Sequence, residues 1–285
     1  MKDHQQLVGQ SIKRIESSYD IKDTILFALG LGFGSDPMDK QELAFVYEQD
    51  LRTLPTMSLV IGYPGFWMRE PEYGFQWQKV LHAEEELIIH EPLPVEGQLV
   101  GETFVDEVVD RGEEKGVFVY TRKELTDAVS GKQYATVVSN TLARGDGGFG
   151  GPSEPRPRPA DIPDRAPDYV CDIATLPQQA LIYRLSGDMN PLHADPGVAT
   201  SVGFSQPILH GRCTMGVAQR AILKTCCDYD AARVKSMQLR FSAPFLPGET
   251  LRTEMWVDGE SIQFRSSAVE RDVVVLNNGT VRLGN

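Results

Sequence analysis

The feature that most constrains the fold of this chain is a weak internal repeat on either side of a glycine- and proline-rich segment. Residues 25–32 resemble residues 181–188, and residues 91–99 resemble residues 243–251. Between the two copies, residues 145–151 contain five glycines, and six prolines follow them. A chain built from two related units is expected to fold as two similar substructures with a connection between them.

Each unit combines helical and strand patterns. Met215, Ala218 and Ile222 recur at helical spacing, which predicts one longer helix between residues 210 and 224. A short helix, an irregular region and then antiparallel strands, twice over, indicate an α+β protein. The strands are predicted where β-branched and aromatic residues gather, at 117–121, 134–139, 233–241, 251–257, 262–269 and 273–275.

The segment 145–167 is expected to separate two domains. No Lys-Ser/Thr pair follows its glycines, so a turn or a close backbone contact is favoured over a phosphate-binding loop. The prolines favour an extended polyproline linker, whose roughly 16 residues at ~3.1 Å each reach about 50 Å. We therefore expect an N-terminal domain at 1–144 and a C-terminal domain at 168–285.

Composition excludes several classes of function. The net charge of −12 over 285 residues disfavours nucleic acid and anionic membranes as main partners. No apolar run approaches the ~18 residues of a membrane span. The four cysteines are scattered without a CxxC pair, which favours a reducing, intracellular compartment and core packing over disulfides or zinc.

The densest chemistry lies in the run 183–196. Asp188, Asn190 and His193 place a carboxylate, an amide and an imidazole within six residues. A glycine before the Asp and a proline after the Asn take the backbone out of regular structure. On a continuous helix, side chains five residues apart diverge by about 140°, but on a turn after a helix they can converge. A convergent Asp and His can transfer protons at neutral pH.

A second group of residues supports a reaction centre. Gly211 opens the predicted helix, and free N–H groups at a helix start can hold a partly negative oxygen. The preceding His210 is expected to have a structural role, and Asp195, before a proline, to cap a helix. A metal site is not expected, because no cluster supplies a third and fourth ligand. The acidic segment 84–86 is expected to be a solvated face without a role.

Together, residues 183–196 and 209–211 resemble the hydratase-2 motif of the MaoC-like double-hotdog family. These are the (3R)-specific 2-enoyl-CoA hydratases, including the hydratase unit of peroxisomal multifunctional enzyme type 2. The resemblance implies two hotdog domains side by side, each an antiparallel sheet wrapped around a helix, and a homodimer. It covers nearly the whole chain, since parts of the first half also resemble the family's first hotdog, at 23–32, 54–56, 81–84, 110–112 and 144–151.

The resemblance implies an activity and roles for the motif. The family adds water to a trans-2-enoyl-CoA to give the (3R)-3-hydroxyacyl-CoA, without a metal or redox cofactor. Asp188 and His193 would hold the attacking water, and Asn190 would help fix that water or the Asp188 carboxylate. The N–H of Gly211 would bind the thioester carbonyl. Which of Asp188 and His193 is the base and which the acid stays open.

The resemblance also implies substrate contacts. Arg111, where the family usually has Lys, would be a cation near the CoA portion. Arg212 stands at a usually apolar position and is expected to point to solvent or to reach a CoA phosphate. Residues 30–34 and 54–62 resemble the half that houses the acyl chain, whose length and branching stay open. The implied substrate-binding set is His82, Ala83 (usually Gly), Arg111, Asp188, Met189, Asn190, Pro191, Leu192, His193, Gly211 and Phe241.

Three alternatives and the compartment complete the expectations. A dehydratase on acyl-carrier-protein thioesters would use the same residues but need a basic docking surface. A hotdog thioesterase would release free CoA, and an acyl-CoA-binding module would need no acid/base pair. Residues 1–6 show no signal-peptide core, and residues 282–285 are not a peroxisomal tripeptide. We expect an intracellular protein, cytoplasmic in a bacterium or in the peroxisomal matrix of a eukaryote.

Overall fold

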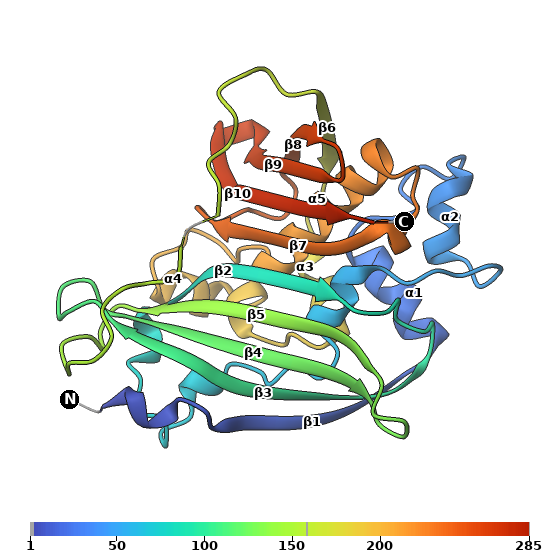
Figure 1. Ribbon diagram of the computed structural model, residues 1–285. Helices are drawn as coiled ribbons and strands as arrows, with labels where there is room; N and C mark the ends of the chain where they lie inside the picture. Colours follow the sequence, from blue (N-terminus) through green and yellow to red (C-terminus); the bar gives the residue numbers. More distant parts are fainter. Residues whose placement is uncertain (1–2, 158, 285) are drawn as a thin grey trace.

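The computed structural model describes residues 3–157 and 159–284. Residues 1–2, 158 and 285, which belong to the expected domain ends and linker, lie outside this part. The strands form one ten-stranded sheet in the order β1-β3-β4-β5-β2-β7-β10-β9-β8-β6 (Figure 1). The strands are β1 (Ser11–Tyr19), β2 (Val80–Ile89), β3 (Gly97–Asp110), β4 (Val117–Asp127), β5 (Gln133–Ala143), β6 (Tyr169–Ala174), β7 (Val234–Phe241), β8 (Thr250–Asp258), β9 (Ser261–Ala268) and β10 (Val273–Leu283).

The strand order repeats itself across the middle of the sheet. The first five strands lie in the order 1-3-4-5-2, and the last five lie in the corresponding order 6-8-9-10-7. Every neighbouring pair is antiparallel. The halves join through β2 and β7, where buried Leu87 pairs with buried Met237. The sequence repeat therefore corresponds to one connectivity used twice.

The helices differ between the halves. The longest is α5, which is buried almost throughout and lies against the second half of the sheet. In the first half, the 3₁₀ turn Pro55–Leu59 packs against α5 and β2, and α1 flanks it. The helices are α1 (Ile21–Gly30), α2 (Lys40–Val46), α3 (Gln179–Tyr183), α4 (Pro196–Ser201) and α5 (Gly211–Cys226). None of the helices in the described residues is long and apolar enough to cross a bilayer.

Helix α5 carries polar side chains toward the first half of the chain. Arg212 binds Glu85, Gln219 binds Thr56, and Arg220 binds a carboxylate of α2. Its apolar residues, including Met215 and Ile222, join the main hydrophobic core. The helix thus lies between the second half of the sheet and the irregular segment of the first half.

The expectation that a helix precedes the strands in each half is wrong, because strands β1 and β6 come before the first α-helix of their halves. Both are edge strands of the sheet, and β1 buries few of its residues. Strand β1 carries mostly polar side chains and so lacks the continuous apolar run by which a strand is recognised. β2 was missed for a related reason, since three acidic residues interrupt it.

The glycine-rich start of the linker makes the expected close backbone contact. A Cβ at Gly147 would collide with the carbonyl oxygen of Gly112. The N–H groups of Gly148 and Gly150 donate to the carboxylate of Asp110, both at 2.7 Å. These bonds pack the segment against the end of β3.

Candidate active site

The turn that carries Asp188 follows a helix, as its sequence predicts. α3 passes into the 3₁₀ turn Arg184–Ser186, and Gly187 then adopts a φ of 129°, which other residues rarely adopt. The side chain of Asn190 accepts the N–H of Leu192 at 3.1 Å and so caps the next 3₁₀ turn, Pro191–His193. This pair of turns reverses the chain and brings Asp188 and His193 together.

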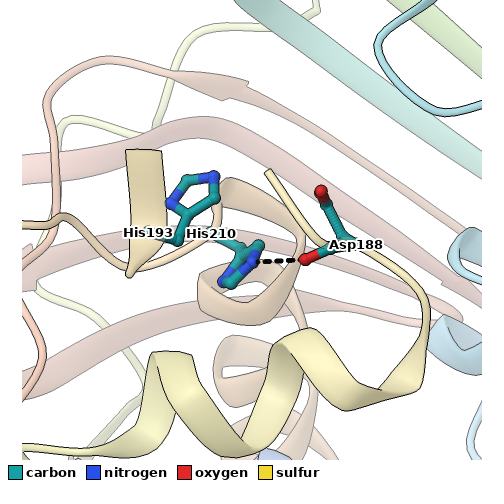
Figure 2. Close-up of side chains that lie close together, drawn as sticks. All are labelled: Asp188, His193 and His210. Atoms are coloured by element: carbon teal, nitrogen blue, oxygen red, sulfur yellow. Dashed lines mark hydrogen bonds between the residues drawn. The ribbon is translucent and has the colours of Figure 1, made fainter. Parts of the chain in front are cut away.

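Three side chains converge here. One ligand atom from each of Asp188, His193 and His210 lies within 4.8 Å of the others (Figure 2). The rings of His193 and His210 stack with centroids 3.7 Å apart and an interplanar angle of 27°. The Nε2–H of His210 donates to the main-chain carbonyl of Asp188 at 3.1 Å. His210, expected to be only structural, therefore lies inside the cluster.

The hydrogen bonds of His193 define its tautomer. Its Nδ1 lies 2.9 Å from the carbonyl oxygen of Ile208, and a carbonyl can only accept, so Nδ1 carries the hydrogen. In the neutral ring, Nε2 is then an acceptor. Burial lowers the pKa of His193 below its ordinary value of 6.5. Burial, and then repulsion by His193, lower the pKa of His210 as well. Both shifts favour the neutral form of the ring at pH 7.

The carboxylate of Asp188 is held from one side. Its Oδ1 accepts the main-chain N–H of Asn190 at 3.2 Å. The side-chain oxygen of Asn190 is engaged with its own turn, as described above. The main-chain N–H of Asn190 therefore holds the carboxylate beside the imidazole acceptor.

Gly211 opens α5 directly after His210, and no side chain caps its helix start. A Cβ at Gly211 would lie 2.9 Å from the ring of Phe241, so only a glycine lets that ring lie against the helix. The Phe241 ring in turn contacts His82, with ring centroids 4.6 Å apart. Uncapped N–H groups at this helix start can bind a partly negative oxygen.

His82 and Ala83 lie at an irregularity of β2. The pairing with β5 shifts between His82 and Glu84, which leaves Ala83 as an extra residue, and such bulges re-aim neighbouring side chains. His82 Nε2 lies 2.7 Å from Glu85 Oε2. The bulge thus presents two of the predicted substrate contacts at the edge of the site.

Two expectations near this bulge are wrong. The acidic segment 84–86 is not a solvated face, because the Glu85 side chain is fully buried. Arg212 neither faces solvent nor is free for a phosphate, since its Nε and Nη2 donate to Glu85 at 3.1 and 3.0 Å. Burial alone would raise the pKa of Glu85, but Arg212 and His82 outweigh it and lower that pKa. Neighbouring sequence could not show a pairing across 127 residues.

Arg111 lies apart from the cluster. It follows β3 at the hairpin to β4, where its guanidinium covers the ring of Phe118 at 4.7 Å. Phe118 pairs with Leu142 on β5, which pairs with Leu81 on β2. Arg111 is therefore at the same end of the sheet as His82. The three spacings β3–β4, β4–β5 and β5–β2, of ~4.8 Å each, separate the two main-chain positions by about 14 Å.

The cluster holds one more possible metal ligand than the sequence indicated. His210 supplies the third donor that the sequence lacked near Asp188 and His193. The geometry is nevertheless poor for an ion, because a nitrogen lone pair lies in its ring plane and these two planes are stacked nearly parallel. His210 Nε2 is also engaged with a carbonyl.

A pocket of about 240 Å³ adjoins the turn that carries Asp188. Residues 185–187 form one wall, and the other walls come from β1, α1 and the segment around Pro55–Leu59. Apolar side chains, including Phe27, Met57, Val60 and Ile61, line much of it. The first half of the chain thus supplies most of the space beside the cluster.

Fold and comparisons together define a class of protein. Residues 17–145 match the family model described as MFE-2 hydratase 2 N-terminal domain, and residues 159–279 match the MaoC like domain. The structure of a MaoC-like dehydratase from Phytophthora capsici superposes with a TM-score of 0.87 at 33% identity, covering 100% of this chain and 98% of that one. A Mycobacterium tuberculosis protein with a double hotdog fold superposes over 95% of this chain and 96% of its own with a TM-score of 0.53; at 15% identity this shows the fold alone. The chain is a MaoC-like double-hotdog protein, which confirms the predicted fold class.

Curated relatives narrow the class further. A probable enoyl-CoA hydratase 2 of Dictyostelium discoideum is 38% identical over 97% of this chain and 95% of its own length. Peroxisomal multifunctional enzyme type 2 of Mus musculus is 38% identical over 97% of this chain, which spans only 38% of that longer protein. The chain belongs to the enoyl-CoA hydratase 2 family.

Proposed function

We propose that this protein is a (3R)-specific enoyl-CoA hydratase, which reversibly adds water to trans-2-enoyl-CoA in fatty-acid or related acyl-CoA metabolism. The observation that carries the proposal is the convergence of Asp188 and His193 beside the uncapped start of α5 and an apolar pocket. A carboxylate, an imidazole acceptor and a hydrogen-bond donor for an oxyanion are the groups that hydration needs.

In this proposal His193 is the base. Its Nε2 is the free acceptor of a neutral ring and takes a proton from water as the water oxygen bonds to C3. The Asp188 carboxylate accepts the water's other hydrogen and so orients the water. The N–H of Gly211 stabilises the enolate oxygen of the thioester. The proton on His193 then passes to C2, so that the product gains one water in all.

The substrate would extend in two directions from this centre. The acyl chain would enter the pocket beside Leu185–Gly187. The CoA portion would pass His82, Ala83 and Phe241 toward Arg111, whose distance of about 14 Å across the sheet suits a long, flexible thioester. Met189, Pro191 and Leu192 would line the site beside the catalytic pair.

Several further expectations belong to this proposal. The reaction needs no metal or redox cofactor, because the residues above supply every proton transfer. We also propose a homodimer, division into domains at 1–144 and 168–285 with the linker between them, and a location in bacterial cytoplasm or the peroxisomal matrix. The net charge of −12 supports an acyl-CoA substrate over acyl-carrier-protein thioesters, because carrier proteins bind basic surfaces.

The direct test is the ultraviolet absorbance of the enoyl thioester during incubation with crotonyl-CoA or trans-2-decenoyl-CoA. The proposal predicts a loss of absorbance without release of free CoA, and a product that a (3R)-specific but not a (3S)-specific dehydrogenase oxidises. Free thiol instead would indicate a thioesterase. Reaction of carrier-protein thioesters alone would indicate the dehydratase, and CoA-resin binding without any turnover would indicate a binding module.

A further inference from the structure

Lys123 is a buried amine that the proposed reaction does not use. It lies on β4 and is only 4% exposed. Its Nζ donates to the carbonyl oxygens of Ser58 at 2.7 Å and Ile61 at 2.6 Å. Burial, and then repulsion by Arg212, lower the pKa of Lys123 well below its ordinary value. A lysine is seldom buried without a specific partner, and here the partners are main-chain carbonyls.

Arg212 reaches the same short segment from α5. Its Nη1 donates to the carbonyl of Leu59 at 3.3 Å, while the rest of its guanidinium binds Glu85. The carbonyls at the end of a short 3₁₀ turn have no following turn to satisfy them. Two side chains from separate elements supply those donors here.

The segment they hold forms a wall of the pocket proposed for the acyl chain. Met57, Val60 and Ile61 all face that pocket. Contacts on either side of the wall restrict it further. The hydroxyl of Thr56 donates to Gln219 Oε1 at 2.8 Å, and the N–H of Gly62 donates to a β1 hydroxyl at 3.1 Å.

We propose that Lys123 and Arg212 act as positioning residues that hold the pocket wall at residues 57–61 and thereby determine which acyl chains the enzyme accepts. The inference rests on the proposed hydratase function. Lys123 has no bond to the catalytic cluster among the described residues, so its loss acts on the wall. A short acyl group that hardly enters the pocket does not depend on the wall, but a long one does.

The test compares hydration of crotonyl-CoA and trans-2-decenoyl-CoA by the wild type and by Lys123→Met. With the wall released, kcat/KM for decenoyl-CoA is expected to fall about ten-fold relative to crotonyl-CoA, the discrimination that one or two methylene contacts supply. Lys132→Met is the matched control, because Lys132 lies on the surface with a half-exposed side chain. It should leave the ratio of the two substrates unchanged.

A second variant covers the case in which Lys123→Met does not fold. Thr56→Val keeps the side-chain shape and removes only the hydroxyl's hydrogen bond to Gln219, while the main-chain N–H of residue 56 still donates to Gln219 at 3.3 Å. The variant should therefore shift the ratio in the same direction by a smaller factor. Assays are run well below each melting temperature. If kcat/KM fell by the same factor for both substrates while the enzyme stayed active, this inference would be wrong but the hydratase proposal would stand. A wild type that hydrates neither thioester would overturn the hydratase proposal, and this inference with it.

Discussion

The two halves of the molecule share one strand order but differ at the position proposed for the chemistry. In the second half that position is Asp188, beside His193. The internal repeat aligns it with Gly32 in the first half. A Cβ at Gly32 would lie 2.9 Å from a guanidinium nitrogen of Arg220, so the corresponding space is filled by that side chain. Arg220 is itself neutralised there by the buried Glu42.

The halves differ a second time in what covers the sheet. α5 runs for 16 residues in the second half, whereas the first half has the turn Pro55–Leu59 and short helices there. A long helix satisfies its own carbonyls, but the short turn depends on Lys123 and Arg212. The shorter cover leaves room for the pocket. In such a chain one half can therefore carry the proposed reacting groups while the other half forms the pocket, without a change of strand connectivity.

The strongest test of this comparison removes the reacting groups from the second half. Asp188→Asn and His193→Gln keep side-chain size but lose the carboxylate or the ring acceptor, and each should lower kcat about 10²- to 10⁴-fold. The assay is steady-state hydration of crotonyl-CoA. Asp195→Asn is the control, because Asp195 caps α4 at an exposed position. Comparable losses in all three variants would contradict the assignment.

The buried ion pair between Glu42 and Arg220 should contribute to the stability of the fold and not to activity. Glu42→Ala leaves the guanidinium of Arg220 buried and unpaired, which is expected to lower the free energy of unfolding by about 3–5 kcal/mol. Activity per folded molecule should persist at low temperature. Asp172→Ala, which breaks the exposed pair with Arg252, should leave the melting temperature unchanged. Equal decreases in the melting temperature of the two variants would contradict this prediction.

The start of α5 can be tested by filling the space that Phe241 uses. In Gly211→Ala, the new methyl would press on that ring and displace the helix N–H. Loss of one such donor is expected to reduce kcat about 10²- to 10³-fold. Gly203→Ala serves as a control in which the added Cβ meets nothing within 4 Å, although its positive φ lowers stability. If Gly211→Ala kept full kcat, the helix start would not be the oxyanion site.

The smallest expected effect is a change of kcat/KM and of stability with pH. Because the pKa of His193 lies below 6.5, its neutral form should keep kcat/KM above half-maximal at pH 6.5, and the rate should fall only on further acidification. Because the buried site disfavours the charged ring, the free energy of unfolding is highest above pH 6.5. It decreases as the pH falls from 6.5 through the lowered pKa of His193. Rate profiles and thermal melts between pH 4 and 8 check both. An acid limb centred above pH 6.5 would contradict the prediction.

The sequence predicted the turn that brings Asp188 and His193 together, for a local reason. Gly187 and Pro191 allow few backbone conformations, so the six residues around them determine that Asp188 and His193 converge. The helix start at Gly211 was equally local. His210 was underestimated, because its stacking on His193 joins two segments that only the fold brings together. Its position directly before the helix glycine was the available signal.

What the sequence by itself determined is therefore the family and the repeated α+β organisation, together with the residues proposed for proton transfer. Only the tertiary structure decided which charged residues are buried and what they bind. Glu85 pairs with Arg212 across 127 positions, and Lys123 binds the carbonyl of Ser58 across 65 positions. Whether a charge is solvated or buried depends on which surfaces pack over it. That packing is a property of the assembled sheet and helix, which no short stretch of sequence contains.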